Sequence, residues 1–457
     1  MSTPQNPYTH GPLGAVFAKT ALPIILVMGL NGLLAVADAL FLGHYVGAAA
    51  LGAVTLMFPL YMFITALATL VASGMSSILA RHLGAGHINA AQRVFAGAHG
   101  LALLIAALLI VAFWQFGAPL VLLIAGGNAA LATMGALYIG IIVMFTPLAF
   151  VLALNSDALR CEGRIGFMAL VSVLVALANI ACNYVLIALL DMGVAGSAYG
   201  TALAQGLAFG VLVVFRLWGR TVLRLSALMQ NSLVAGWRRI IALGAPPSLN
   251  FMGIALGAAA IIAALQLVQT PRMADTIAAY GIVTRIQTFM FLPLLGLSFA
   301  MQSITGNNFG AQMWQRSDDS LRIAITVALV YSALAQLVLN LCARQIGAAF
   351  VSETVVIDEV ARIMPAMTAL YILAGPLMMI GGYFQAIGDA SRAAILGLSR
   401  TYLFVLPLTL ILPRLLGEAW IWRVAPISEA LLLLLTLAVL AQTARKHGRR
   451  RGLFFAR

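Results

Sequence analysis

The sequence predicts an all-α membrane protein of twelve transmembrane helices, and three observations lead to that prediction. The chain has 457 residues, of which 63% are hydrophobic. Only 9% of the residues are charged, whereas soluble domains carry about a quarter. Apolar stretches of about 20 residues, the length that crosses the hydrocarbon core of a bilayer, recur along the whole chain. These observations exclude an ordinary soluble globular fold.

The expected spans follow one another with short connections between them. In chain order they cover residues 17–43, 48–78, 94–116, 130–156, 165–190, 194–217, 240–268, 277–304, 321–343, 361–387, 393–415 and 419–443. Several of them exceed the minimum length, so we expect these helices to tilt, bend or extend beyond the hydrocarbon.

The net charge of +13 is distributed unevenly between alternate loops. With a cytoplasmic N-terminus, one side holds most of the basic residues: Lys19, Arg81, Arg93, Arg160, Arg164, Arg216, Arg220, Arg224, Arg238, Arg239, Arg316, Arg322, Arg392, Arg400 and the tail from Arg445. The other side holds only Arg272, Arg344, Arg362, Arg414 and Arg423. Because short basic loops stay in the cytoplasm, we expect a protein of the bacterial inner membrane with both termini on the cytoplasmic side. This distribution explains the charge without nucleic-acid binding.

Two pairs of similar segments, each separated by about 225 residues, indicate an internal repeat. Residues 76–85 resemble residues 302–311, and residues 159–163 resemble residues 384–388. Six helices per half give both halves the same orientation, so we expect a pseudo-two-fold axis along the membrane normal, a recurring transporter design. The predicted parts are an N-terminal segment (1–16), an N-lobe (17–217), a linker (218–238), a C-lobe (239–444) and a basic tail (445–457).

The sequence resembles the multidrug and toxic compound extrusion (MATE) transporters over nearly its whole length. The segments that carry the resemblance keep a fixed order along the chain: 38–44, 51–54, 80–86, 158–163, 179–183, 196–201, 383–388 and 426–429. Within the family, the chain resembles the bacterial DNA-damage-inducible-F (DinF-like) branch. The other bacterial branch carries acidic residues in its seventh and tenth helices, and residues 240–268 and 363–387 contain none.

Asp38 is the first candidate for ion coupling, because it lies within the first expected helix. Ionisable groups inside hydrocarbon are costly and face a cavity or a partner, and burial favours the protonated carboxyl. These properties suit a proton carrier. Asn31 lies two turns earlier, and Pro23 can bend the same helix. The alternatives are an aspartate at the headgroups and a static kink at the proline.

The resemblance places an ion-binding network around Asp38 on five further residues: Tyr138, Asn155, Asn179, Asn183 and Thr201. Asn179 and Asn183 are four residues apart and share one helix face. Relatives carry an aspartate where this chain has Asn183, so the departure favours protons as the coupling ion, with sodium as the alternative. The alternative role of the asparagines is hydrogen bonding between helices.

The remaining candidates concern the C-lobe and the substrate. Arg285 and Glu429 lie at similar depths in their expected helices, so we expect them to form a structural ion pair, with coupling as the alternative role of Glu429. Met28, Asn31 and Gln205 are the candidate residues of a substrate cavity, since methionine adapts to varied ligands. The three cysteines are scattered, so we expect no metal cluster.

Together, the residues and the resemblance predict a secondary active multidrug efflux antiporter, of the kind that confers antibiotic resistance. It would export amphipathic, cationic or aromatic compounds in exchange for protons, by alternating access, as a monomer without a cofactor. The chain has no Walker motif for ATP. The alternatives are a flippase for lipid-linked precursors and a membrane-bound enzyme or scaffold. We expect no enzyme activity, because the sequence lacks a reactive constellation.

Overall fold

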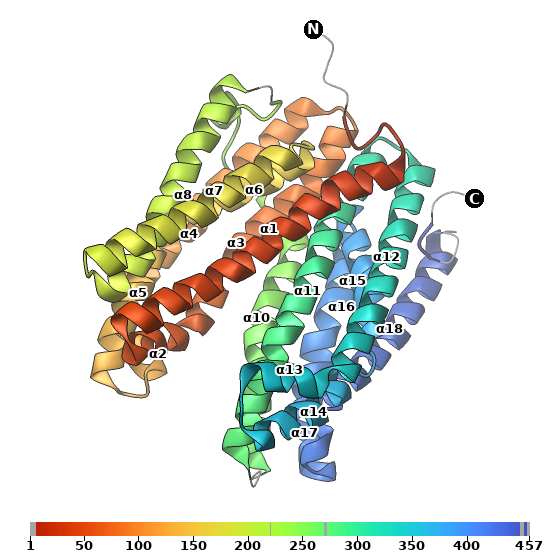
Figure 1. Cartoon of the computed structure of the whole chain (residues 1–457). Helices are drawn as coiled ribbons and strands as arrows, with labels where there is room; N and C mark the ends of the chain where they lie inside the picture. The colour runs from red at the N-terminus through yellow and green to blue at the C-terminus, as the bar shows by residue number, and fades with distance from the viewer. Residues whose placement is uncertain (1–5, 220, 269–271, 448–451, 455–457) are drawn as a thin grey trace. The chain divides into compact units, whose positions relative to one another are not determined.

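The structure, a computed structural model, describes residues 6–219, 221–268, 272–447 and 452–454 (Figure 1). Within these residues the chain folds into eighteen α-helices with short connections. The predicted all-α membrane fold is therefore confirmed. Of the predicted tail, residues 448–451 and 455–457 lie outside the described part, as do residues 1–5 and residue 220 of the linker.

The first half of the chain contains ten helical elements before the second half begins. They are α1 (Leu13–Phe41), η1 (Leu42–Val46), α2 (Ala48–Leu56), α3 (Phe58–Gly84), α4 (Ile88–Ile124), α5 (Ala129–Met144), α6 (Thr146–Cys161), α7 (Ile165–Asn183), η2 (Tyr184–Leu189) and α8 (Gly193–Trp218). A short helix, α9 (Ser226–Gln230), follows in the predicted linker.

The second half repeats this pattern of long apolar helices. Its elements are α10 (Trp237–Leu267), α11 (Met273–Gly310), α12 (Trp314–Leu341), α13 (Ala343–Phe350), α14 (Thr354–Thr368), α15 (Tyr371–Ala386), α16 (Ala390–Leu398), η3 (Ser399–Val405), α17 (Leu406–Leu416), η4 (Glu418–Trp420) and α18 (Val424–His447).

Ten spans among the described residues are long and apolar enough to cross a membrane, and two bent helix pairs bring the number to twelve. The pair α5 and α6 bends by 52°, and the pair α14 and α15 bends by 44°. At the first bend Pro147 stands in the opening turn of α6. Proline has no backbone N–H and its ring clashes with the preceding turn, so the apolar stretch 130–156 folds as two helices.

The predicted second span, 48–78, differs from the structure. The short helix α2 ends at Leu56, and the membrane-spanning helix α3 begins at Phe58 and continues to Gly84. Pro59 lies in the first turn of α3, where its fixed backbone angle favours the start of a helix. Hydropathy alone merged the two helices, because both are apolar.

Three wide π-helical turns interrupt the spans, and each adjoins a polar residue. The turn η1 starts four residues after Asp38, and η2 starts directly after Asn183. The turn η3 contains Arg400. Such turns are rare in proteins, and those that occur are frequently found at functional sites. They therefore mark these three positions as candidates for function.

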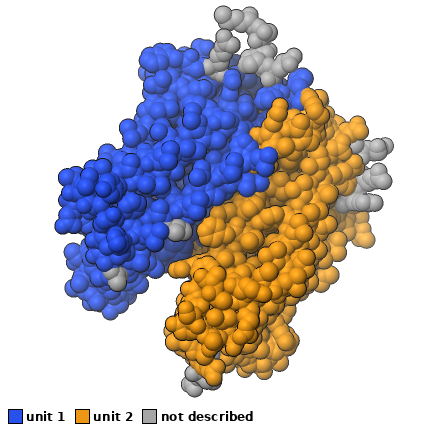
Figure 2. Space-filling model, in the orientation of Figure 1, with its two compact units in different colours: residues 1–10, 22–251 blue, residues 11–21, 252–457 orange. Residues whose placement is uncertain are grey.

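The chain divides into two compact units, which Figure 2 shows in different colours. Unit 1 comprises residues 1–10 and 22–251, and unit 2 comprises residues 11–21 and 252–457. Both α1 and α10 therefore contribute to both units. In unit 2, the core around Trp422 gathers buried residues such as Tyr280 and Met364.

The predicted linker 218–238 packs against α4 within unit 1. Glycines make this close approach attainable, since a Cβ atom at Gly97 would lie 1.9 Å from the Ala235 carbonyl oxygen. A Cβ atom at Gly100 would lie 2.1 Å from the carbonyl oxygen of Leu233. The Trp237 indole also donates to the Gly97 carbonyl at 2.9 Å. The linker is therefore a packed part of unit 1.

Candidate functional site

A chain of polar side chains links α1, α7 and α8 inside unit 1. The Asn183 side-chain amide donates to Asp38 Oδ1 at 2.6 Å and to Asn179 Oδ1 at 3.0 Å. The Asn179 amide in turn donates to the Thr201 hydroxyl at 2.9 Å. The structure thus brings together four of the six residues predicted for ion coupling.

The two asparagines are fully buried, whereas Asp38 is partly exposed. Asn183 Oδ1 is buried and has no hydrogen-bond partner among the described residues. Gly200 lies directly against this oxygen, because a Cβ atom built on it would stand 2.1 Å from Asn183 Oδ1. Sequence reasoning missed Gly200, although its place directly before Thr201 is a usable signal. The close approach of α7 and α8 therefore depends on a residue without a side chain.

Two tyrosines complete the surroundings of the Asp38 carboxylate. Tyr138 on α5 and Tyr61 on α3 both lie within electrostatic range of it. Tyr138 is a predicted site residue, and Tyr61 is not. None of the ion pairs formed by described residues includes Asp38. The carboxylate is therefore surrounded by neutral groups.

Asn155 does not join this chain, contrary to prediction. Its amide nitrogen contacts His99 Nε2 at 3.1 Å, and its Oδ1 accepts from Arg216 Nε at 3.1 Å. Arg216 also forms an ion pair with Glu162 at 2.7 Å, in which both side chains are buried. Asn155 is engaged by this buried charge on α8, so it belongs to a separate polar cluster.

The charge pattern alone does not reveal this second cluster. The charge pattern assigns Arg216 to a cytoplasmic loop, yet this residue is only 1% exposed. Glu162 Oε1 accepts from the Thr221 hydroxyl and from the Leu223 backbone N–H, so the chain after α8 folds back onto this carboxylate. A lone acid in the repeated segment 159–163 is the signal that could have identified the cluster.

The predicted ion pair between Arg285 and Glu429 is wrong. Glu429 Oε1 accepts from Arg400 Nε at 2.7 Å, whereas Arg285 is exposed on α11 and in none of the ion pairs of the described residues. Depth along a helix does not fix which helix a side chain faces. Glu429 faces η3, because α18 packs against that turn.

Arg400 is also counted among the cytoplasmic residues by the charge pattern. The structure places it ten residues beyond Ala390 in the span Ala390–Leu416, which is well inside the membrane segment. A charge at that depth is costly and marks a functional position by default. Sequence reasoning missed this residue because it counted Arg400 with the cytoplasmic loops, although the expected span 393–415 contains it.

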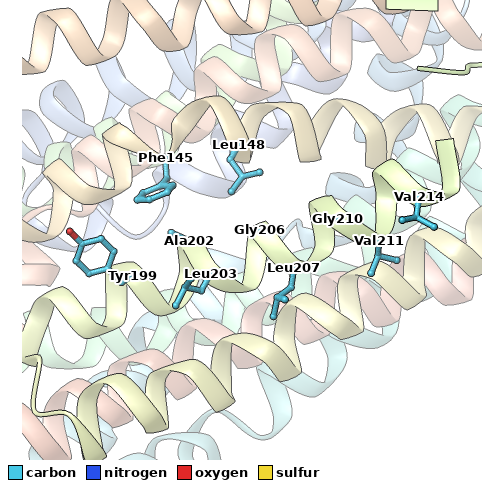
Figure 3. Close-up of a pocket in the computed structure, with 10 residues that line it drawn as sticks. All are labelled: Phe145, Leu148, Tyr199, Ala202, Leu203, Gly206, Leu207, Gly210, Val211 and Val214. Atoms are coloured by element: carbon cyan, nitrogen blue, oxygen red, sulfur yellow. The ribbon is translucent and has the colours of Figure 1, made fainter. Parts of the chain in front are cut away.

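The predicted cavity residues lie on two helices of unit 1. Met28 and Gln205 are partly exposed, and Asn31 is exposed. None of them lines the larger of the described pockets, an apolar groove of about 680 Å³ between α6 and α8 (Figure 3). Its α8 residues, among them Leu203 and Leu207, lie on the helix face opposite Thr201. This groove is thus separate from the polar chain.

Within the described part of the chain, no group of three or more His, Cys, Asp or Glu residues is arranged to hold a metal ion. The polar chain itself offers one carboxylate, two amides and one hydroxyl, joined by hydrogen bonds.

The comparisons with known proteins agree with this architecture. The MatE family model matches residues 23–185 and 261–411, one segment in each unit. The chain is 24% identical over 435 residues to the FAD transporter of Shewanella oneidensis, covering 92% of this chain and 93% of that relative. It is 21% identical over 439 residues to the multidrug export protein MepA of Staphylococcus aureus, covering 94% of each.

A solved structure shows the same fold. The MATE multidrug transporter DinF-BH, solved as a complex, superposes with a TM-score of 0.87 at 25% identity, covering 97% of both chains. The predicted family is therefore confirmed on sequence and on structure. With a family model that matches both halves of its length, this chain belongs to the MatE family of membrane transporters.

Proposed function

We propose that this transporter exports amphipathic, cationic or aromatic compounds in exchange for protons by alternating access, with Asp38 as the proton carrier. One observation carries the proposal. Asp38 accepts a hydrogen bond from the neutral Asn183 amide at 2.6 Å and takes part in none of the ion pairs of the described residues. A carboxylate without a fixed cation can exchange one positive partner for another.

The hydrogen bonds suggest how protonation of Asp38 changes the contacts of the neighbouring helix α7. An ionised Asp38 only accepts hydrogen bonds, and the Asn183 amide supplies one. A protonated Asp38 becomes a donor and needs an acceptor. Asn183 Oδ1 lacks a partner among the described residues, and it can accept once the amide turns. That turn would break the bond to Asn179, so proton uptake would loosen the contact within α7.

Exchange follows from competition for the one carboxylate. A lipophilic cation and a proton each neutralise the Asp38 charge, and both together would leave an excess positive charge in hydrocarbon, which is costly. Binding of one therefore favours release of the other. The chain has the neutral Asn183 where relatives carry an aspartate, so the site has one carboxylate fewer to offer sodium, and this supports protons as the coupling ion.

The proposal also includes the location, orientation and oligomeric state of the protein. We place it in the bacterial inner membrane as a monomer with both termini in the cytoplasm, in keeping with the excess of Lys and Arg on one set of loops. No cofactor is needed, because the ion gradient drives transport.

Purified protein in proteoliposomes tests the proposal with a fluorescent cationic dye of the rhodamine class. A proton gradient and a sodium gradient are imposed separately on the wild type, on Asp38→Asn and on the control Asp319→Asn, whose carboxylate is 40% exposed in a surface ion pair. We expect dye movement under the proton gradient, lost only in Asp38→Asn. Movement under sodium alone would overturn the coupling ion, and no movement under either gradient would contradict dye export.

A second candidate function is the export of an aromatic nucleotide such as FAD. Two observations favour it: a relative that covers 92% of this chain is named a FAD transporter, and Arg400 is half-exposed inside a membrane span. The same proteoliposomes, loaded with FAD and energised with a proton gradient, test it through the loss of flavin fluorescence from the lumen.

A further inference from the structure

Unit 2 contains an ion pair whose two members differ in exposure. Arg400 Nε donates to Glu429 Oε1 at 2.7 Å. The Glu429 side chain is 5% exposed, whereas the Arg400 side chain is 45% exposed. The carboxylate is thus sealed behind the guanidinium, and the guanidinium is open on its other side.

The terminal nitrogens of Arg400 form the open side. Arg400 makes no other hydrogen bond to a described residue, so its two Nη groups keep four N–H donors. An arginine that faced lipid at this depth would cost several kcal/mol. This side of Arg400 therefore needs a polar partner, such as water or a solute.

Three further polar atoms near the ion pair have no hydrogen-bond partner within the described residues. They are Glu429 Oε2, the Ser428 hydroxyl and the Tyr371 hydroxyl, all buried. Tyr371 lies within electrostatic range of both Arg400 and Glu429. The two hydroxyls can donate hydrogen bonds, whereas Glu429 Oε2 can only accept one. Buried polar atoms without partners are rare in folded proteins, so this cluster is a candidate site for a polar ligand.

A second arginine–glutamate pair in the molecule shows what a purely structural pair looks like. Arg216 and Glu162 are 1% and 4% exposed. Arg216 also donates to Asn155, to the Thr221 hydroxyl and to the Leu223 carbonyl. Its Nε and Nη1 donors are used inside the protein, and its Nη2 is buried without a partner among the described residues. The Nη groups of Arg400 are not enclosed in this way, because its side chain is 45% exposed.

We propose that Arg400 binds a phosphate or carboxylate group of a transported aromatic solute within unit 2. Glu429 acts as the positioning residue, because its bond to Nε orients the guanidinium and leaves the Nη fork for the ligand. The inference rests on the proposed transport function and names a class of solute, one that joins an aromatic body to an oxyanion. The planar fork binds two oxyanion oxygens at once, which lysine cannot do.

Binding of two flavins to the purified protein in lipid nanodiscs tests the proposal. Riboflavin and FMN have the same aromatic flavin ring system and the same sugar-alcohol chain, and only FMN carries a terminal phosphate. We expect the wild type to bind FMN about ten-fold more tightly than riboflavin, as for a hydrogen bond to a charged group. Arg400→Gln should remove this preference and leave riboflavin binding unchanged, and Arg400→Lys should keep only part of it.

Matched variants separate local from general effects. Arg285→Gln removes another exposed arginine of unit 2 and should keep the FMN preference. Arg400→Gln leaves Glu429 unpaired, so Arg400→Gln/Glu429→Gln is the second variant, with two neutral side chains of similar size. Thermal unfolding of each variant shows whether it is folded.

Three results would overturn the proposal: equal wild-type affinity for FMN and riboflavin, no binding of either flavin at millimolar concentration, or an FMN preference that survives in both Arg400 variants. Dye export is measured on the same preparations. The two proposals can fail separately. If the wild type exports no dye while Arg400→Gln loses the flavin preference, proton-driven dye export is contradicted and the oxyanion site is supported.

Discussion

Two carboxylates of this transporter that lie in membrane spans, Asp38 in unit 1 and Glu429 in unit 2, differ in the groups that hold them. Each is linked to a π-helical turn, since Asp38 precedes η1 and Glu429 bonds to Arg400 of η3. Asp38 is held by the neutral amide of Asn183, and Glu429 is held by a guanidinium. One architecture therefore supports a carboxylate whose charge can be removed and a carboxylate whose charge is matched.

The difference matters when a proton arrives. Protonation of Asp38 removes a charge that has no fixed counterion, which favours uptake in an apolar surrounding. Protonation of Glu429 would leave the Arg400 charge without its partner, which is unfavourable. The comparison favours unit 1 for the proposed proton exchange and unit 2 for a fixed electrostatic role.

The largest expected effect separates the two carboxylates by transport. Asp38→Asn should abolish proton-driven export of a cationic dye, because an amide carries no titratable proton. Glu429→Gln should keep most of the export, since Arg400 retains a hydrogen-bond acceptor. Efflux rates from proteoliposomes measure both. A folded Glu429→Gln protein as inactive as Asp38→Asn would break the comparison.

The second-largest expected effect is the loss of stability when the arginine of either arginine–glutamate pair is replaced. Arg216→Gln should lower the free energy of unfolding by about 3–5 kcal/mol, because it leaves Glu162 buried and unpaired. Arg400→Gln should lower it by less, because the Arg400 side chain is 45% exposed and solvent weakens such a pair. Thermal unfolding in detergent ranks the two variants, and the opposite order would show that Arg400 is a structural residue.

A glycine tests whether the Asp38 chain needs close helix packing. Gly200→Ala would place a Cβ atom 2.1 Å from Asn183 Oδ1, so Asn183 must shift, at a cost of about 1–3 kcal/mol. We expect slower dye export and a lower melting temperature. Gly206→Ala on the same helix is the control, because no atom lies within 4 Å of its added Cβ. Equal behaviour of the two variants would contradict this packing.

The smallest expected effect comes from the end of the polar chain. Thr201→Val removes the acceptor of the Asn179 amide, and hydrogen bonds between membrane helices contribute about 1 kcal/mol or less. We expect a slightly lower melting temperature and a modest loss of export. Thr288→Val is the control, since the Thr288 hydroxyl bonds only within its own helix. A Thr201→Val protein as inactive as Asp38→Asn would show that export depends on the whole polar chain and contradict the small effect expected here.

The sequence predicted the spans from a local pattern, and the resemblance to the family predicted most of the Asp38 chain. Hydropathy marks the spans, and a spacing of four residues puts Asn179 and Asn183 on one helix face. Partners on other helices were harder to predict. The turn η3 departs from the 3.6-residue period and brings Arg400 to Glu429, so helix-depth counting selected Arg285 in error. The prediction for Asn155 was wrong for a related reason, because the charge pattern assigns its partner Arg216 to a loop.

The packed linker has a practical consequence for engineering. A segment between two homologous halves is the usual place to insert a reporter protein or a protease site. Here residues 233 and 235 lie against glycines of α4, and Leu223 is tied to Glu162. An insertion at either place would disrupt unit 1. Met229 on α9 is 91% exposed, so we expect a label attached there to leave unit 1 undisturbed.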